Sequence, residues 1–321
     1  MFDFKPKTLY HWYRNYLSDY QNDINSGIWL KNKIPIVDEQ TGEIKSERPV
    51  YIAKPENISD SLTLDDKRIG KDSFTIMTNQ KTGKIILLVE TLKAEELKRA
   101  VEYLGESIAN VQNISCDMSS SYLKFCEETF PDATIIIDKF HVINQVLEAV
   151  QSIRIRIKNQ LLEYLPKGKK RTEADKKTLS DLELLKRSKF LLTQSESNWN
   201  DYQNELMQKV FKQFEELKTA YELSETFKQW YHKNNCKKHP IIIEKELFNW
   251  YETVENSKLK EFKSVVKMIE KHEDRILNYF QKALTNAKAE NLNSKIQRFI
   301  INNYGIRDKD FALYRINKYF S

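Results

Sequence analysis

Three strand-like segments joined by very short turns lie in the first third of the chain. They span residues 62–69, 72–79 and 84–91, and each of the two links between them contains a glycine. Links this short join antiparallel neighbours, so the segments predict a three-stranded meander. Glycine and proline number only seven each in 321 residues. Tight turns are therefore rare elsewhere, and long helices are expected to fill most of the chain.

Helix and strand patterns alternate after this meander. A helical pattern at 94–104 precedes a strand at 110–118, and a second helix precedes a continuously apolar strand at 133–138. A right-handed helical crossover would place the strand at 110–118 beside and parallel to the first strand of the meander. This order predicts an α/β fold with a five-stranded mixed sheet flanked by helices.

Composition divides the chain into four stretches. Residues 1–55 predict an N-terminal helical segment, 56–150 the first part of the α/β core, 151–280 a helical insertion, and 281–321 a polar helix with a short C-terminal helix. The helix at 8–20 has two interpretations. It is either a partial helix-turn-helix that contacts DNA or an aromatic-rich helix that packs on the core.

Charge and cysteine content narrow the class of protein. Lys and Arg number 52 against 46 Asp and Glu, a mild excess that weakly favours a polyanionic partner. The three cysteines form no CxxC pair and the five histidines no HExxH spacing, which argues against a zinc site. No apolar run approaches the roughly 18 residues of a membrane span. The N-terminus has no apolar signal region, so we expect a cytoplasmic protein without a membrane partner.

Acidic residues end the two strands that the crossover would bring together. Asp65 and Asp66 close one strand, and Asp117 closes the other. Desolvated carboxylates at neighbouring strand ends repel each other unless a divalent cation lies between them, and oxygen ligands suit Mg²⁺. The alternative, that these aspartates are ordinary turn residues, is the more common one on spacing alone.

The polar helix after residue 281 carries a further acid in an unusual setting. Glu290 and Asn293 lie on one polar stripe, with Lys295 and Arg298 beside it and an apolar face opposite. A single acid among amides and bases differs from the Lys- and Glu-rich helices elsewhere in the chain. A solvated helix face remains the simpler explanation of the pattern.

Four blocks of the sequence resemble bacterial insertion-sequence transposases of the DDE kind, most closely the family usually written IS-L-three. In chain order they are LTLDDKRIGKDSFTIMTNQKTGKI, then ISCDMSSSYLKF with FPDATIIIDKFHVI, then AYELSETFKQW, and finally TNAKAENLNSKIQRFIINNYGIRD. The blocks occur in the family's order and cover residues 60–321. The resemblance implies an RNase H-like core with a large all-helical insertion before the final catalytic helix.

The same resemblance implies a DDE triad of Asp65, Asp117 and Glu290 that binds two Mg²⁺, with Mn²⁺ as an alternative. Asp66 is the alternative first acid because the pair is adjacent. Motif positions expected to support this site or to contact DNA are Asp66, Asp138, His141 and Asn293. The implied activity is cleavage of DNA at the ends of an insertion sequence, followed by transfer of the strand to target DNA.

Double-stranded DNA, as element ends and as target, is therefore the expected partner. The basic residues predicted to contact it are Arg154, Arg156, Lys158, Lys169, Lys170, Arg171, Lys295, Arg298 and Arg307. We expect a homodimer on DNA, because two element ends must be cut together, and a location at the bacterial nucleoid.

The N-terminus departs from the family pattern. Full-length relatives carry a zinc-binding segment and helix-turn-helix modules, whereas this chain has no CxxC pair and places only residues 1–55 before the core. A separate N-terminal DNA-binding companion protein could supply the missing part. Two other functions stay open: an RNase H-like nuclease without strand transfer, and a non-catalytic DNA-binding protein derived from a transposase.

Overall fold

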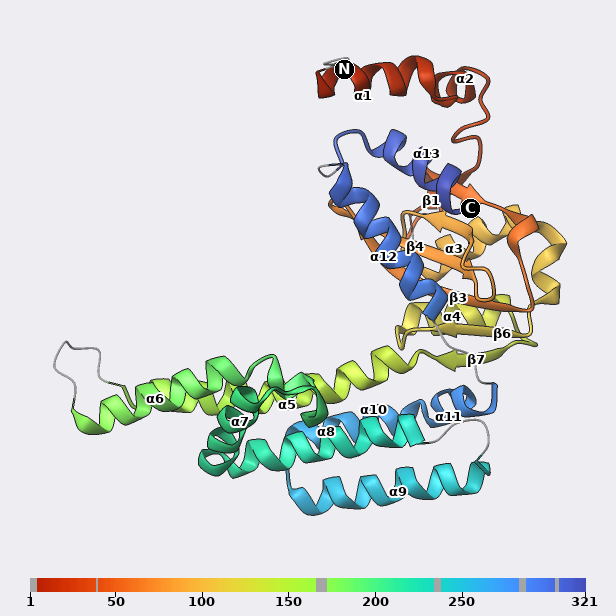
Figure 1. Ribbon diagram of the computed structural model, residues 1–321. Coiled ribbons are helices and arrows are strands. Elements are labelled where there is room, and N and C mark those ends of the chain that lie inside the picture. Colours follow the sequence, from red (N-terminus) through yellow and green to blue (C-terminus); the bar gives the residue numbers. More distant parts are fainter. Residues whose placement is uncertain (1–4, 39, 166–171, 234–237, 283–286, 304–305) are drawn as a thin grey trace. The chain divides into compact units, whose positions relative to one another are not determined.

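The chain folds into two compact units, shown in Figure 1. One comprises Met1–Asp138 with Leu284–Ser321, and the other Lys139–Ala283. The computed structural model describes residues 5–38, 40–165, 172–233, 238–282, 287–303 and 306–321. The boundary expected at residue 150 falls inside one long helix of the second unit, α5 (Lys139–Glu163).

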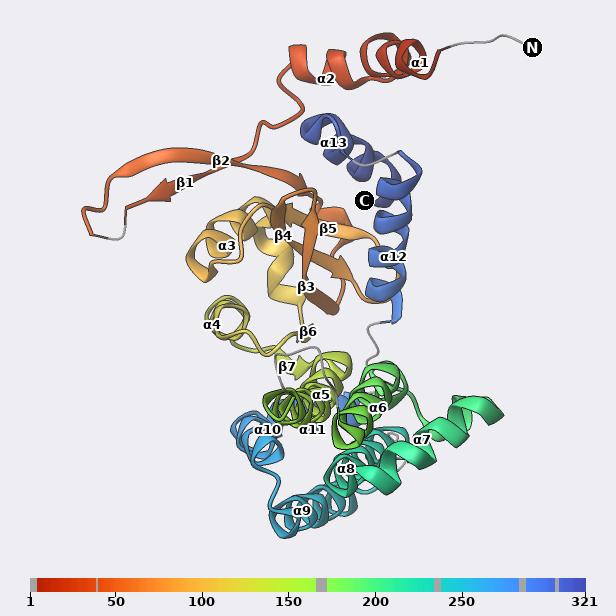
Figure 2. The ribbon, with the colours of Figure 1, turned by 90° about the vertical axis from the view of Figure 1, so that its left-hand side faces the viewer.

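A seven-stranded mixed sheet forms the centre of the first unit (Figure 2), in the order β1-β2-β5-β4-β3-β6-β7. Its strands are β1 (Lys33–Val37), β2 (Ile44–Ala53), β3 (Ser61–Ile69), β4 (Asp72–Asn79), β5 (Ile85–Val89), β6 (Asn113–Cys116) and β7 (Thr134–Ile137). The meander β3-β4-β5 is antiparallel, and β6 and β7 continue the sheet parallel to β3. The predicted α/β fold and mixed sheet are confirmed. Five strands are predicted, and the β1–β2 hairpin adds two more at the β5 edge.

Helices cover both faces of this sheet. They are α1 (Pro6–Trp12), α2 (Tyr20–Asn25), α3 (Ala94–Val101), α4 (Ser120–Thr129), α12 (Ala287–Asn302) and α13 (Lys309–Phe320). Helices α3 and α4 lie on one face, and α12 and α13 on the other (Figure 2). Because side chains alternate along a strand, Leu62 and Leu64 pack toward α3 and α4, while Ile69 packs toward α12 and α13.

Two turns that contain glycine lie next to the two ends of α12 and show how this helix crosses the sheet. At Gly83, in the β4–β5 turn, a Cβ would lie 3.5 Å from Lys288 in the first turn of α12. At Gly70, in the β3–β4 turn, a Cβ would lie 3.9 Å from Ile306, beyond the end of α12. Both glycines have φ near 70°, a backbone conformation that other residues adopt only with strain. Helix α12 therefore runs along the β3–β4 hairpin from one turn to the other.

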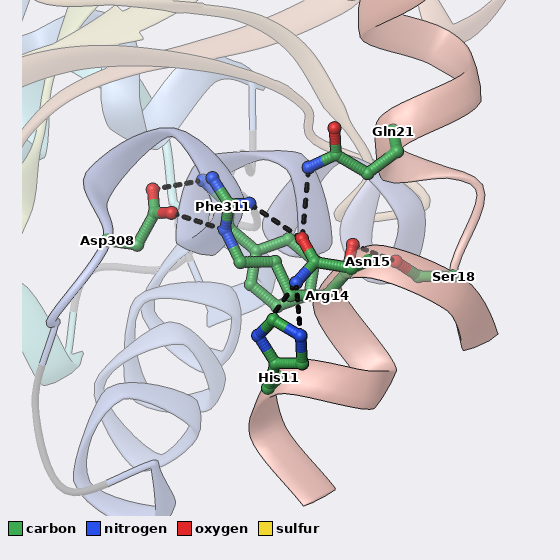
Figure 3. Close-up of polar contacts among 7 residues, drawn as sticks. All are labelled: His11, Arg14, Asn15, Ser18, Gln21, Asp308 and Phe311. Carbon is green, nitrogen blue, oxygen red and sulfur yellow. Dashed lines mark hydrogen bonds and ion pairs between the residues drawn. The ribbon is translucent and has the colours of Figure 1, made fainter. Parts of the chain in front are cut away.

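The N-terminal helices pack on this unit through aromatic and polar contacts. Phe311 of α13 contacts the rings of Tyr10, Tyr13 and Tyr20 at centroid distances of 5.8, 5.8 and 4.9 Å. Nε of Arg14, in a π-helical segment between α1 and α2, lies 2.7 Å from Oδ2 of Asp308 (Figure 3). These contacts match the second interpretation of the 8–20 helix, an aromatic-rich helix packed on the core.

The second unit consists of helices throughout its described residues. They are α5, α6 (Glu173–Ser188), α7 (Asp201–Gln213), α8 (Glu215–Lys233), α9 (Pro240–Ser257), α10 (Lys260–Lys271) and α11 (Glu273–Lys282). Buried aromatic rings join α8 and α9: the indole N–H of Trp250 donates to the carbonyl of Leu223 at 3.0 Å. Among the described helices of the whole chain, none combines the length and apolarity that crossing a membrane requires.

Candidate active site

Asp65 and Asp117 stand level with each other on neighbouring parallel strands. Strands β3 and β6 pair Thr63 with Ser115, and two further steps along this register lead to Asp65 and to Asp117, one residue beyond β6. The backbone N–H of Ser119 donates to Oδ1 of Asp117 at 2.7 Å, which turns the chain into α4. Ligand sites in α/β sheets commonly lie outside the carboxyl ends of parallel strands, and this pair occupies that edge.

Asp138 extends the same row of acids. Strands β6 and β7 pair Cys116 with Ile137, so Asp138 is level with Asp117. The backbone N–H of Asp138 donates to the carbonyl of Cys116 at 2.9 Å. Asp65, Asp117 and Asp138 are all half-buried. Asp117 and Asp138 directly follow the last residues of β6 and β7, whereas Asp65 and Asp66 lie inside β3, which continues to Ile69. The expectation that these two aspartates close a strand is therefore wrong.

The two adjacent aspartates of β3 face opposite sides of the sheet. Asp65 is opposite Ile76 of β4, whose side chain belongs to the core beneath α12 and α13. Asp66 is opposite Thr75, whose hydroxyl lies 2.9 Å from the phenol oxygen of Tyr122 in α4. Asp65 is therefore the aspartate of this pair that faces α12.

The buried phenol of Tyr122 lies close to three carboxylates, those of Asp66, Asp117 and Asp65. Burial has the largest effect on the pKa of Tyr122 and raises it. The hydrogen bond with Thr75 lowers this pKa, and the three negative charges raise it. The net result is a pKa well above the ordinary value. The phenol therefore stays protonated. The neutral phenol can therefore keep its hydrogen bond with Thr75 without adding a negative charge beside the three aspartates.

Asn293 connects α12 to Asp65. Its Nδ2 donates to Oδ2 of Asp65 at 2.6 Å, while Oδ1 of Asp65 accepts the backbone N–H of Asp66 at 2.9 Å. Nζ of Lys67, two residues along β3, donates to the carbonyl of Asn293 at 3.3 Å. Glu290 is exposed one helical turn before Asn293. The face of α12 that carries Glu290 and Asn293 is thus directed to the Asp65 side of β3.

The chemistry of these donors fits a hard divalent cation. Asp65 and Asp117 present carboxylate oxygens from level positions on neighbouring strands, and Glu290 adds a third carboxylate from the helix that contacts Asp65. Oxygen ligands of this kind suit Mg²⁺ and Mn²⁺. Within the described part of the chain, no three acidic, histidine or cysteine side chains already converge as a metal site. These carboxylates are therefore the right type of ligand for such an ion, although they do not converge on one point in this structure.

A groove of about 430 Å³ opens beside Asn293. Its lining comes from β3 and α12 and consists of Lys67, Asn293, Ser294, Gln297, Arg298 and Ile301. Two cations and three neutral polar side chains in one groove suit an anion such as a phosphodiester. Lys67 was not among the residues predicted to act here. Its position two residues after Asp65, on the same face of the strand, is the signal in the sequence that would have identified it.

The predicted DNA contacts in the first unit are on its surface. Lys295, Arg298 and Arg307 are exposed. Lys295 and Arg298 lie on α12, and Arg307 follows that helix. These positions agree with a surface role.

Arg154 and Arg156 are engaged inside the helical unit. Arg154 is 7% exposed, and its guanidinium donates to Oε1 of Gln151 at 2.8 Å and to the carbonyl of Leu185 at 3.3 Å. Burial lowers the pKa of Arg154. Arg156 bonds to Glu216 and, at 2.8 Å, to Glu261, and these contacts raise its pKa. In this structure both arginines have partners within the helical unit and contribute to helix packing, and their assignment as DNA contacts stays a prediction.

The remaining predicted residues of the second unit differ in accessibility. Lys158 is exposed, and half-buried His141 lies beside the ring of Phe140 with centroids 5.8 Å apart. The predicted contacts that lie outside the described residues are Lys169, Lys170 and Arg171.

A mixed sheet with a row of acids across its parallel strands, and an acid-bearing helix against one face, is consistent with an RNase H-like α/β protein. The chain belongs to the DDE transposase family of the IS-L-three type, because that family's sequence profile, described as Transposase, matches residues 62–316. The resemblance seen in the sequence is thereby confirmed.

One curated relative is similar over a large part of the chain. It is the transposase for insertion sequence element IS1001 of Bordetella parapertussis, 22% identical over 242 residues. The aligned region covers 74% of this chain and 55% of that protein. The chain therefore spans about half the length of this relative.

Proposed function

We propose that this member of the transposase family catalyses metal-dependent cleavage of DNA at the ends of an insertion sequence and transfer of the cut strand to target DNA. One observation carries the proposal. Asp65 and Asp117 are level on neighbouring parallel strands, and Asn293, one helical turn from Glu290, bonds to Asp65. This arrangement supports Asp65, rather than Asp66, as the first acid of the triad.

Asp65, Asp117 and Glu290 would hold two Mg²⁺ or Mn²⁺ ions. Such ions supply a nucleophilic hydroxide and stabilise negative charge on the phosphate during in-line displacement. The protein's own groups orient the ligands: Asn293 fixes one oxygen of Asp65, and the Ser119 N–H fixes one oxygen of Asp117. Asp138, at the next strand end, is proposed to support this edge, and His141 to support the site or contact DNA.

DNA is proposed to lie along α12, where charge and shape suit a phosphate backbone. The groove beside Asn293 contains Lys67 and Arg298, and Lys295 and Arg307 are exposed in the same unit. Phosphate contacts position DNA without reading its sequence. Lys158, Lys169, Lys170 and Arg171 remain proposed contacts of the helical unit.

Recognition of the element's ends is proposed to need more than this chain. Arg14, a cation of the N-terminal helical segment, is bonded to Asp308 within its own unit. We therefore propose a companion protein that supplies end-specific binding. We also propose a homodimer on DNA, because two ends must be cut together, acting at the bacterial nucleoid.

The test is an assay with DNA that carries the element's inverted repeats, in Mg²⁺ and in excess chelator. Wild type should cleave the ends only with metal and should join a precut 3′ end to target DNA. Glu290→Gln should lose both activities yet still bind DNA, while Glu43→Gln, on the exposed β1–β2 hairpin, should retain them.

The other outcomes separate the alternative functions. Cleavage without joining of the precut end would indicate a nuclease. DNA binding with no cleavage, in the presence and in the absence of a companion protein, would indicate a non-catalytic derivative. Full activity in chelator would contradict the metal requirement.

A further inference from the structure

Asn293 is held between two residues of the same strand. Its side-chain Nδ2 donates to Oδ2 of Asp65 at 2.6 Å, and its backbone carbonyl accepts Nζ of Lys67 at 3.3 Å. Asp65 and Lys67 are two residues apart on β3 and so face the same side of the sheet. A single residue of α12 is thus fastened to β3 through its side chain and its main chain at once.

These bonds complete the placement of α12 on the sheet. The first turn of α12 packs against Gly83, and Leu292 and Ile296 are buried in the core beneath the helix. Apolar packing of this kind tolerates small sliding movements, because it has no direction. Two hydrogen bonds to fixed strand positions have direction, and they specify which turn of α12 stands next to Asp65.

The same bonds constrain the carboxylate of Asp65. One oxygen accepts the amide of Asn293 and the other accepts the N–H of Asp66, so the plane of the carboxylate is set before any ligand arrives. Partners that hold a metal-ligating carboxylate typically change metal affinity or activity by about 10- to 100-fold when they are removed.

We propose that Lys67 and Asn293 are positioning residues that form a clasp between β3 and α12. The Asn293 amide presets the Asp65 carboxylate for a divalent cation, and the Lys67 ammonium keeps Asn293, and with it the turn that carries Glu290, at that position. The part of this inference that concerns the cation rests on the proposed function. The part that concerns the helix stands without it.

The first experiment measures Mn²⁺ binding to the full chain by electron paramagnetic resonance, without DNA. Asn293→Ala should weaken Mn²⁺ binding by about 10- to 100-fold. The matched control is Asn291→Ala, at an exposed position of the same helix, which should bind Mn²⁺ as wild type does. Equal affinity of Asn293→Ala and wild type, or equal losses in both variants, would overturn the role of Asn293.

The second experiment needs no metal. Lys67→Gln should raise the hydrogen-exchange rate of the α12 amides by about fivefold, the loss expected of one hydrogen bond. Arg68→Gln changes an exposed residue on the other face of β3 and should leave exchange in α12 unchanged. Lys67→Arg keeps the positive charge and a donor of long reach, which the shorter, neutral Gln amide does not provide, and should restore part of the protection.

The two experiments distinguish failure of the clasp from failure of the proposed function. If wild type binds no Mn²⁺, the proposed metal chemistry fails, while exchange in α12 still tests the clasp. If Lys67→Gln and Asn293→Ala both leave α12 exchange at the wild-type rate, the clasp is wrong whatever the metal does. A general loss of folding in Asn293→Ala would appear as faster exchange in every helix, and Lys67→Gln would then decide.

Discussion

Two arginines of the helical unit and two aspartates of the α/β unit have different kinds of described bonding partners. In the helical unit, Arg156 bonds to glutamates of two other helices, and Arg154 is buried against main-chain and amide acceptors. In the α/β unit, Asp65 and Asp117 accept bonds from a neutral amide and a backbone N–H. Neutral donors orient a carboxylate without cancelling its charge.

This difference distinguishes charged side chains that stabilise the fold from those that can bind a ligand. A charge that is neutralised by an opposite charge in the same unit mainly stabilises packing. A neutral donor, such as the Asn293 amide or the Ser119 N–H, orients a carboxylate and leaves its negative charge in place. Four predictions test this comparison.

The largest effect is expected at Asp65. Asp65→Asn preserves shape and removes the charge on the side of β3 that faces α12, so strand cleavage should fall by at least about 1,000-fold. Asp66→Asn, on the opposite face, should lower cleavage by less than about tenfold. The check is the cleavage rate of end-bearing DNA at saturating Mg²⁺. A larger loss in Asp66→Asn than in Asp65→Asn would reverse the assignment of the first acid.

A smaller effect is expected at the turn that faces the start of α12. Gly83→Val introduces a branched side chain near Lys288, so it should reduce the free energy of unfolding by about 1–3 kcal/mol more than Gly42→Val. Gly42 has the same φ of 75° and open space around it, which makes it a control for backbone strain alone. Chemical denaturation of both variants measures the difference. Equal losses would show that α12 does not depend on this contact.

Substitutions of Arg298 and Arg156 compare an exposed arginine of the α/β unit with a paired arginine of the helical unit. Arg298→Ala should weaken DNA binding and reduce the slope of log affinity against log salt by about 0.9, the value for one phosphate contact. Arg156→Ala should leave that slope unchanged and should lower the stability of the helical unit by about 2 kcal/mol, because its bonds to Glu216 and Glu261 are lost. Salt-dependent binding and thermal unfolding of each variant provide the measurements. An altered salt slope in Arg156→Ala alone would contradict the separation.

The smallest effect concerns acid. Burial is the largest influence and would raise the pKa of Glu261, but its hydrogen bond with Arg156, a backbone hydrogen bond and the charges of Arg156 and Lys260 together outweigh burial and lower the pKa below the ordinary 4.5. Because the folded-state pKa is lowered, this stabilisation is present above the unfolded pKa and is lost as pH falls through the folded one. Glu261→Gln should therefore flatten the fall of thermal stability below pH 4.5, by about 1 kcal/mol at most.

The control for this pH effect is Glu255→Gln, which removes an exposed pair with Lys263. Its pH profile should follow that of wild type. A profile of Glu261→Gln that cannot be distinguished from wild type across the same range would refute the role given to the Arg156 pair.

Local patterns were enough to predict most of the first unit. The alternation in 62–69, 72–79 and 84–91 predicts β3, β4 and β5 to within about two residues, and the crossover rule predicts that β6 is parallel to β3. The β1–β2 hairpin lies within residues 1–55, for which the sequence predicts a helical segment. The first half of β2 is exposed, so it shows no alternation between apolar and polar residues.

The candidate site was predictable in part. The residues of the triad were proposed from motifs, and their joint role stays a prediction. The choice between Asp65 and Asp66 was not accessible from the sequence, because alternation puts them on opposite faces but does not say which face receives α12. The packing contacts of Arg154 and Arg156 were not predictable from the basic pattern, because composition does not reveal which cations have an acidic or carbonyl partner across a helix interface.

By itself, the sequence determined the order of strands and helices from β3 to β7, the acids that follow β6 and β7, and the apolar face of α12, because these depend on periodicity and on turns between near neighbours. Only the tertiary structure decided that Asn293 meets Asp65 and Lys67 and that Arg156 meets Glu261. Those partners are more than 100 residues apart along the chain. Which distant residues meet is set by the packing of whole helices against a sheet or against one another, and no local pattern encodes that packing.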